Sequence, residues 1–395
     1  MAKEYLYIPQ WLTVQFLTEV LSGHEKEKDL EVTNLDLTQG CVEGDNYICS
    51  MYRAKVEYKT QKATLSKTLI IKTVSEGYAV SASFINEIGM YKKVLPEFEK
   101  ILREKNDTTK LHAECIYYSL EPRQVIIFED LVEKGYAMVQ NRLLTDEEIC
   151  RAYTKLAKVH AVSMKFINER PEFLKEFNDG ICLLESPCMK CGMDSFTSFL
   201  GRIPELKKYQ SHFEKIELNF TGRLWEAMKE YQTKPQPGYY VLCHGDFQTK
   251  NLMFKHNKET GSLEDCMLLD YQGSYVAPLA VDLMYSIYMI MGREQRTEKL
   301  ETLLNHYFSV LLETLRKIGY QGIMPTHHTF WAEVKRLKDY EFLFLSTYLP
   351  WSQGVWLRGY ESYSNAETDQ KLKEFIEECK IMLARFESSG YFAEL

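Results

Sequence analysis

Long hydrophobic runs are scarce in this chain of 395 residues, and so are the marks of secretion. The longest apolar stretch, residues 276–291, is too short to cross a bilayer and contains Asp282, so it predicts a buried helix. Residues 1–10 lack the basic segment and the apolar segment of a signal peptide. We therefore expect a cytoplasmic protein with no membrane span.

An excess of basic residues is also missing. The 48 lysines and arginines are outnumbered by 56 aspartates and glutamates, which gives a formal net charge of -8. A nucleic-acid-binding surface would need clustered Lys and Arg, so we expect no nucleic-acid partner.

Cysteine is too sparse for a disulfide scaffold, because the ten cysteines are scattered along the chain. They fit reduced thiols. Cys188 and Cys191 form a CxxC pair, but a zinc site would need two further ligands and the sequence has no second such pair. We therefore expect neither metal binding nor redox chemistry there.

The first third of the chain predicts an antiparallel sheet with two helices. Residues 8–21 carry apolar side chains at helical spacing and predict a leading helix. A second helix is expected at 83–94, and Pro96 is expected to end or bend it. The predicted strands are rich in Val, Ile, Tyr and Thr and cover 47–58, 65–74, 115–120 and 124–128.

The rest of the chain is mainly helical. Thr145 and Glu148 form a capping pattern at the start of a long helix. Two short apolar strands, 252–254 and 266–269, flank a hydrophilic turn. We predict an α+β fold of two lobes: a small lobe with the sheet at 1–131 and a large helical lobe at 132–395.

The strongest chemical signal is the segment from Cys243 to Asn251, which follows an apolar run. A carboxylate at Asp246 can accept the proton of an attacking hydroxyl, and an amide oxygen at Asn251 can coordinate Mg²⁺, as phosphoryl transfer requires. Asp270 ends the second short strand, 19 residues after Asn251, and is suited to hold Mg²⁺ against nucleotide phosphates. The alternative is that Asp246, Asn251 and Asp270 are unrelated polar residues at turns. The spacing of the three residues along the chain disfavours this alternative.

Two further residues are expected to support this segment. His244 is expected to orient the loop by hydrogen bonding instead of transferring protons. Asp282 lies in an apolar helix and would be costly there without a partner, for which a backbone amide of the loop is suited. The alternative is that Asp282 only has an ordinary structural role at the N-terminus of its helix. His160, on an apolar stripe, is expected to be a hydrogen-bonded core histidine.

Lys72 lies in a strand and shares a face with Ile70 and Val74. A lysine that points toward an apolar layer needs an anionic partner. Glu87 is the candidate, because it falls on the apolar edge of the 83–94 helix. Such a strand lysine and helix glutamate position nucleotide phosphates in kinases.

Two segments give weaker signals for nucleotide binding. Gly44 and Asn46 lie in a turn with two glycines, which permits close approach of the backbone to a phosphate, although a simple turn fits equally well. Glu129 and Leu131 follow a strand where exposed backbone could hydrogen-bond an adenine, and a plain linker is the alternative.

Seven motifs occur in order along the chain. They are Glu43-Gly44-Asp45-Asn46-Tyr47, Ile70-Ile71-Lys72, Asn86-Glu87-Ile88-Gly89, Phe128-Glu129-Asp130-Leu131, Leu156-Ala157-Lys158-Val159-His160-Ala161, His244-Gly245-Asp246 with Asn251, and Leu269-Asp270-Tyr271-Gln272 with Asp282. By these motifs, the chain resembles, from about residue 12 to the 350s, the insect ecdysteroid kinase-like family, which belongs with choline and aminoglycoside kinases in the protein-kinase-like fold.

The resemblance implies a kinase with ATP and Mg²⁺ as cofactors, which transfers the γ-phosphoryl group to a hydroxyl of a small molecule. It implies that Asp246 is the base, that Asn251 and Asp270 are metal ligands, and that Lys72 and Glu87 form the phosphate-positioning pair. The chain departs from the family at Gln248, where Trp is usual, at Lys250, and at Tyr271, where Phe is common. We expect these departures to affect the identity of the acceptor and not the nucleotide chemistry.

The expected acceptor is an ecdysteroid or a similarly apolar alcohol. A choline- or ethanolamine-like amine and a foreign hydroxylated compound are alternatives, and so is a non-catalytic nucleotide-binding protein of the same fold. The aromatic residues near the C-terminus could line an acceptor cleft or belong to the core. They are Trp331, Phe342, Phe344, Tyr348, Trp351 and Trp356.

Overall fold

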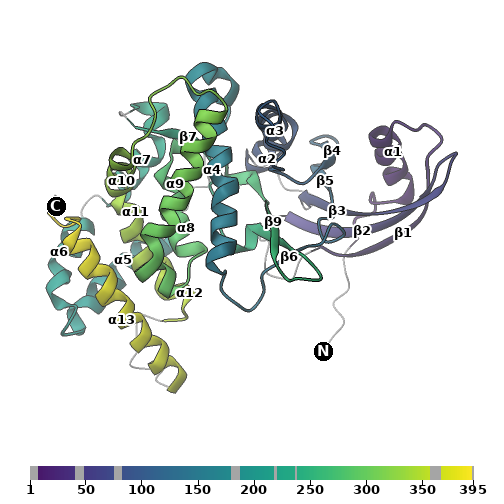
Figure 1. The fold of residues 1–395 in the computed structure, drawn as a ribbon. Coiled ribbons are helices and arrows are strands. Elements are labelled where there is room, and N and C mark those ends of the chain that lie inside the picture. The colour runs from purple at the N-terminus through teal and green to yellow at the C-terminus, as the bar shows by residue number, and fades with distance from the viewer. Residues whose placement is uncertain are drawn as a thin grey trace. The chain divides into compact units, whose positions relative to one another are not determined.

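The computed structural model describes residues 8–40, 49–74, 82–178, 187–217, 220–235, 238–355 and 366–393 (Figure 1). The chain divides into two compact units. Unit 1 comprises Met1–Glu99, Lys110–Ala137 and Met253–Gln272, and unit 2 comprises Lys100–Thr109, Met138–Leu252 and Gly273–Leu395. The predicted α+β class is confirmed. Within the described residues, none of the helices has the length and hydropathy needed to cross a membrane.

Unit 1 contains a five-stranded antiparallel sheet in the order β1-β2-β3-β5-β4 (Figure 1). Its strands are β1 (Glu31–Gln39), β2 (Cys49–Lys59), β3 (Thr64–Val74), β4 (Cys115–Ser119) and β5 (Val125–Glu129). The sequence did not predict β1. This strand lies at the edge of the sheet, and most of its side chains are exposed and polar. Its few apolar side chains, Val32, Leu35 and Leu37, alternate with polar ones, but a register shift between Val32 and Asn34 interrupts the alternation.

The leading helix begins later than predicted. Helix α1 covers Val14–Glu25, and the hydroxyl of Thr13 accepts a hydrogen bond from the amide of Phe16. Residues 8–12 are therefore not helical, because this N-cap starts the helix after them. Leu17 and Leu21 of α1 pack in one core cluster with buried side chains of the sheet, among them Ile71 and Ile127.

Pro96 does not end the helix that precedes it. Helix α2 (Ala82–Gly89) continues through a π-turn, η1 (Met90–Val94), into α3 (Leu95–Arg103). Pro96 occupies the first turn of α3, where a proline needs no amide hydrogen bond to a preceding carbonyl of that helix. The π-turn before it accommodates the change in hydrogen bonding.

The predicted pair of short strands is a hairpin of β8 (Leu252–His256) and β9 (Leu263–Leu268). A third strand, β6 (Tyr136–Met138), adds to β8 and was not predicted, because three residues are too few to show a pattern. The hydroxyl of Tyr136 donates to Asp265 at 2.8 Å. A small core cluster that includes Leu131, Met253 and Met267 lies beneath this sheet.

Unit 2 is built around α4 (Asp146–Glu169) and α9 (Leu300–Lys317), which pack against each other (Figure 1). The predicted capping box of Thr145 and Glu148 is present at the start of α4. The remaining helices of unit 2 are α5 (Pro187–Arg202), α6 (Gln210–Glu217), α7 (Phe220–Thr233), α8 (Ala280–Met289), α10 (His327–Arg336), α11 (Lys338–Leu343), α12 (Leu349–Ser352) and α13 (Ala366–Ser388).

Strands β7 (Tyr240–Cys243) and β10 (Tyr275–Pro278) pair antiparallel in unit 2. The prediction of one helix over residues 276–291 is therefore partly wrong. Its first residues form β10 because Val276 and Ala277 complete the backbone hydrogen bonds of β7, and the helix α8 starts after Pro278.

Candidate active site

The loop that carries the predicted base leaves the end of β7 and enters β8 through one turn of 3₁₀-helix, Thr249–Asn251. Gly245 holds this loop against its neighbour. Its φ is +79°, and a Cβ atom there would lie 1.9 Å from the carbonyl oxygen of Gly273. Only glycine fits at this position, so the close approach of the two backbones is built into the sequence.

The carboxylate of Asp246 accepts hydrogen bonds from three side chains of unit 2. Gln248 Nε2 donates to Oδ1 at 2.8 Å and to Oδ2 at 2.9 Å. The hydroxyl of Tyr285, on α8, donates to Oδ1 at 2.5 Å, and Asn251 Nδ2 donates to Oδ2 at 2.8 Å. Both oxygens are therefore held in a defined orientation.

Tyr285 is suited to remain a donor in this contact. Burial raises the pKa of its hydroxyl, and the negative charge of Asp246 raises that pKa further. The side chain thus keeps its proton across the physiological range and remains a hydrogen-bond donor to Asp246.

Asn251 is buried, and its amide nitrogen also donates to the backbone oxygen of Asp246 at 2.9 Å. Because both contacts use the nitrogen, the amide oxygen is directed away from Asp246. An oxygen in this orientation is suited to a hard cation such as Mg²⁺.

Asp282 lies under the same loop at the start of α8, fully buried. Its Oδ2 accepts from the amide of His244 at 2.6 Å, and its Oδ1 accepts from the amide of Gly245 at 3.0 Å. These are the backbone contacts that the sequence predicted for Asp282. Burial alone would raise the pKa of this carboxyl, but the hydrogen bond and charge of His160 and the loop amides lower it.

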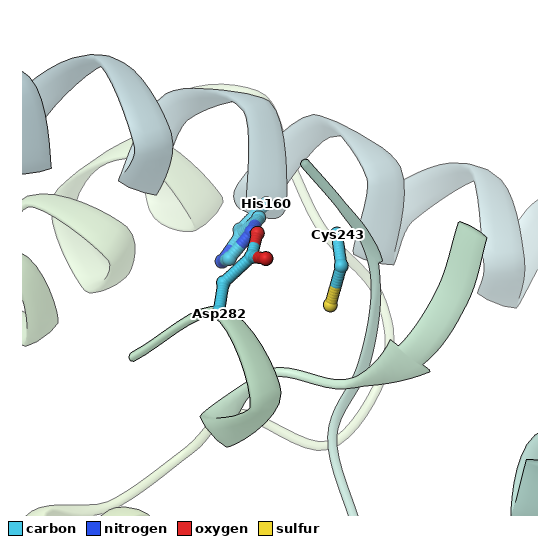
Figure 2. Close-up of side chains that lie close together, drawn as sticks. All are labelled: His160, Cys243 and Asp282. Carbon is cyan, nitrogen blue, oxygen red and sulfur yellow. The ribbon is translucent and has the colours of Figure 1, made fainter. Parts of the chain in front are cut away.

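His160 faces Asp282 from α4, with Cys243 beside them (Figure 2). Its Nε2 lies 3.1 Å from Asp282 Oδ2, and its Nδ1 lies 2.7 Å from the hydroxyl of Tyr307. The carboxylate can only accept, so Nε2 donates to it, and Nδ1 shares a hydrogen bond with the hydroxyl of Tyr307. His160 is thus a hydrogen-bonded core histidine, as predicted.

The three side chains in Figure 2 come close enough to suggest a metal site. Their hydrogen bonds favour a structural role, because both ring nitrogens of His160 and both oxygens of Asp282 already have partners, and Cys243 Sγ donates to the carbonyl of Pro278. The cluster connects α4, β7 and α8 and supports the loop of Asp246.

His244 is buried, and its Nδ1 accepts a hydrogen bond from the amide of Asp246 at 3.3 Å. The contact is internal to the loop and fits the predicted orienting role. This hydrogen bond does not require His244 to transfer protons.

In unit 1, Lys72 lies between two carboxylates. Its Nζ is 2.6 Å from Glu87 Oε2 and 2.8 Å from Asp270 Oδ1. Lys72 and Glu87 are both buried, at 4% and 1% exposure. Burial alone would lower the pKa of Lys72, but the charges of Glu87 and Asp270 more than offset it and raise that pKa.

Glu87 lies on the buried face of α2, where the helical periodicity placed it. Burial raises the pKa of Glu87, although Lys72 opposes this shift. Its contact with Lys72 is present, and the role of the pair in binding nucleotide stays a prediction.

Asp270 has a left-handed backbone conformation, with φ of +59°. This conformation is uncommon for a residue other than glycine, and aspartate is one of the residues that adopt it more readily. The flanking residues hold it in place: Asn86 Nδ2 donates to the carbonyl of Gln272, and the hydroxyl of Tyr271 donates to the carbonyl of Leu111 at 2.8 Å. The latter contact gives a physical reason for tyrosine where the family commonly has phenylalanine.

The other predicted nucleotide contacts have different outcomes. Gly44 and Asn46 lie outside the described residues.

Glu129 ends β5, and its carboxylate forms an ion pair with Lys134 and accepts from the amide of Glu114. Leu131 buries its side chain in the small core cluster, and its carbonyl accepts from the amides of Lys134 and Tyr136. Both residues stay predictions as nucleotide contacts.

Tyr285 is the site residue that the sequence reasoning missed. It follows Asp282 by three positions, and residues at that spacing share one face of a helix. Once Asp282 was expected to bind the loop, the same face of α8 could have been searched for a partner of Asp246. Gln248 was noticed as a departure from the family, but its contact with Asp246 was not foreseen.

Comparison with known proteins gives one family. The model of the ecdysteroid kinase-like family matches residues 43–320. No curated protein sequence matches the chain.

Three solved structures illustrate the structural comparison. The amicoumacin kinase hAmiN, in a complex with AMP-PNP, Ca²⁺ and Ami, is 13% identical over 87% of each chain, with a TM-score of 0.45. An ethanolamine kinase of Plasmodium vivax is 13% identical over 87% of this chain and 81% of its own, with a TM-score of 0.38. A macrolide 2'-phosphotransferase of Brachybacterium faecium is 11% identical over 93% and 97%, with a TM-score of 0.35.

Proposed function

Because the chain belongs to the ecdysteroid kinase-like family, we propose that it transfers the γ-phosphoryl group of ATP to a hydroxyl of a neutral, apolar small molecule such as an ecdysteroid. Membership of this family confirms the predicted class of enzyme, a small-molecule kinase. The cofactors, the acceptor and the roles of single residues belong to the proposal.

The observation that carries the proposal is the carboxylate of Asp246. It lies on a loop held by Asp282, and Gln248, Asn251 and Tyr285 orient both of its oxygens. A fixed carboxylate of this kind is suited to accept a proton from an attacking hydroxyl. In the proposed reaction the acceptor oxygen bonds to the γ-phosphorus, the bond from that phosphorus to the bridging oxygen of ATP breaks, and the hydroxyl proton passes to Asp246.

Asp270 and Asn251 are the proposed ligands of a divalent cation. Asp270 supplies a carboxylate and Asn251 an amide oxygen directed away from Asp246, and Mg²⁺ prefers such oxygen ligands. We assign both residues as ligands on the spacing in the sequence and on family membership. When bound, the ion would neutralise charge that develops on the phosphates.

Lys72 is assigned to the phosphates of ATP. A buried lysine held by Glu87 keeps its positive charge and has little freedom, so it is suited to position an anion. In the structure its Nζ also contacts Asp270, and this contact would be exchanged in part for one to nucleotide and metal.

The decisive experiment measures transfer of the γ-phosphoryl group from ATP to hydroxylated steroids, amino alcohols and foreign alcohols. We expect Asp246→Asn to lower kcat by roughly 10²- to 10⁴-fold, the usual contribution of a general base, while nucleotide still binds. Asp36→Asn, at an exposed position of β1, is the matched control. A wild-type protein that binds ATP but forms no phosphorylated product with any acceptor would favour a non-catalytic nucleotide-binding protein.

A further inference from the structure

The hydrogen bonds of Asp246 use the full capacity of its carboxylate as an acceptor. Oδ1 accepts from Tyr285 at 2.5 Å and from Gln248 at 2.8 Å. Oδ2 accepts from Asn251 at 2.8 Å and from Gln248 at 2.9 Å. An ionised carboxylate offers about four lone-pair positions. An attacking hydroxyl must come within about 3 Å of the base, so one of these contacts has to be exchanged before Asp246 can accept its proton.

Two of the three donors are fixed by further contacts. Tyr285 is 9% exposed, and its ring meets Phe344 edge-on with ring centroids 5.3 Å apart. Asn251 is 8% exposed, and its Nδ2 also donates to the backbone oxygen of Asp246 at 2.9 Å. Movement of either side chain would therefore also break packing or a second hydrogen bond.

Gln248 is the donor that is free to move. Its side chain is half-buried, and within the described part of the chain this side chain hydrogen-bonds to Asp246 alone. Its backbone is held separately: the amide donates to the carbonyl of Asp246 at 3.0 Å, and the carbonyl accepts from the amide of Asn251 at 2.9 Å. The side chain can therefore rotate away while the backbone hydrogen bonds of the loop stay in place.

The chemistry of glutamine fits a contact that is made and broken. Its amide is neutral, so rotation of the side chain away from Asp246 leaves no unpaired cation behind. A hydroxyl is also a neutral donor and can take the same position on a carboxylate oxygen. Until that exchange, the amide occupies a position on each oxygen of Asp246 at which water could otherwise bind. We call these two hydrogen bonds the cap.

Water at the base would lead to loss of ATP. A water molecule bound to Asp246 could attack in place of the acceptor. Its oxygen would bond to the γ-phosphorus, the bond from that phosphorus to the bridging oxygen would break, and its proton would pass to Asp246. The products would be ADP and inorganic phosphate. Exclusion of water from an active site prevents such side reactions.

We propose that Gln248 is a positioning residue whose cap keeps water from the carboxylate of Asp246 and is exchanged for the acceptor hydroxyl. This inference rests on the proposed function and holds for any class of acceptor. It assigns to Gln248 the choice between transfer to an acceptor and hydrolysis of ATP.

ATP hydrolysis in the absence of an acceptor tests the cap. Gln248→Ala should hydrolyse ATP with Mg²⁺ about tenfold faster than wild type, because a hydrogen bond to a charged group no longer has to be broken before water binds. The double variant Asp246→Asn with Gln248→Ala should show no such rise, because the base is missing. Gln370→Ala is the matched control and should behave as wild type, since Gln370 Nε2 donates to Glu374 at 2.7 Å on an exposed part of α13.

The outcomes separate the cap from the proposed function. A loop that is merely damaged would slow hydrolysis, so a rise is specific to the cap, and Gln248→Ser provides a second variant if Gln248→Ala folds poorly. Unchanged or slower hydrolysis in these variants, with phosphoryl transfer that still depends on Asp246, would overturn the cap and leave the phosphotransfer intact. Faster hydrolysis that depends on Asp246, in a protein that phosphorylates no acceptor, would support the cap and contradict the phosphotransfer.

Discussion

At the scale of single residues, the contacts of Asp246 explain how one carboxylate acquires a defined orientation. Tyr285, Gln248 and Asn251 reach it from α8 and from its own loop. Tyr285 is the only one of these that comes from a distant part of the sequence. Its hydrogen bond therefore couples the position of the carboxylate to the packing of α8.

We predict that Tyr285→Phe lowers kcat by about tenfold and leaves KM for ATP unchanged, because the carboxylate loses one charge-assisted hydrogen bond that orients it. Tyr288→Phe on the same helix is the matched control. The hydroxyl of Tyr288 is buried and has no hydrogen-bond partner among the described residues, so its removal should leave kcat unchanged. Equal kcat values for both variants would contradict the role of Tyr285.

Lys72 gives a second prediction at this scale. Lys72→Met should lower kcat/KM for ATP by roughly 100-fold, since a preorganised charge at the phosphates is lost and Glu87 is left buried without its partner. Lys67→Met, on the same strand β3 but in a partly exposed pair with Glu25, is the control. An unchanged kcat/KM for ATP in Lys72→Met would remove the lysine from the nucleotide site.

At the scale of elements, ion pairs connect loops with the helices of unit 2. Asp107, after α3, accepts from Lys158 of α4 at 2.7 Å and from the hydroxyl of Thr109 at 2.6 Å. Although burial opposes it, these contacts lower the pKa of Asp107 from 3.8 to about 2. The carboxylate is therefore harder to protonate in the folded protein than in the unfolded chain.

A pH dependence of stability follows from this shift. The contribution of Asp107 should be complete above about pH 4 and should disappear as the pH falls toward 2, because only the ionised carboxylate binds Lys158. After allowance for solvent screening, we expect Asp107→Asn to cost about 1 kcal/mol of unfolding free energy at pH 7. Urea denaturation of wild type and variant at pH 7 and pH 3 measures it. A difference in unfolding free energy between wild type and Asp107→Asn that grows toward low pH would contradict the prediction.

At the scale of the whole molecule, the proposed cofactors should stabilise the fold by mass action. A ligand at 100 times its Kd adds about 2.7 kcal/mol to the free energy of unfolding. We expect ATP with Mg²⁺ to raise Tm by at least about 2 °C, and EDTA to remove most of that rise. The same shift in EDTA as in Mg²⁺ would show that no divalent cation takes part in nucleotide binding.

Much of the fold could be predicted because it depends on local patterns. The strand that carries Lys72, the capping box at Thr145 and the β8–β9 hairpin each have a complete signal within a few residues. The errors lie where tertiary contacts override that signal. β6 gains its hydrogen bonds from β8, far along the chain, and β10 forms because β7 supplies its partner. β1 is different: it pairs with the next strand, β2, but lies at the sheet edge and exposes mostly polar side chains.

The candidate site divides in the same way. Asp246, Asn251, Asp270, Lys72 and Glu87 could be named from spacing and periodicity, because phosphoryl transfer needs particular groups in a particular order. The roles of Gly44 and Asn46 stay predictions. Nothing local connects Tyr285 to Asp246, since the two residues lie 39 positions apart and meet only when α8 packs beneath the loop.

The sequence by itself determined which chemical groups this protein can offer: carboxylates, an amide, a buried lysine and aromatic rings at recognisable positions. Only the tertiary structure decided which of them touch, because hydrogen bonds between distant segments depend on how helices and strands pack. Asp282 beneath the loop and Tyr285 on Asp246 are consequences of that packing.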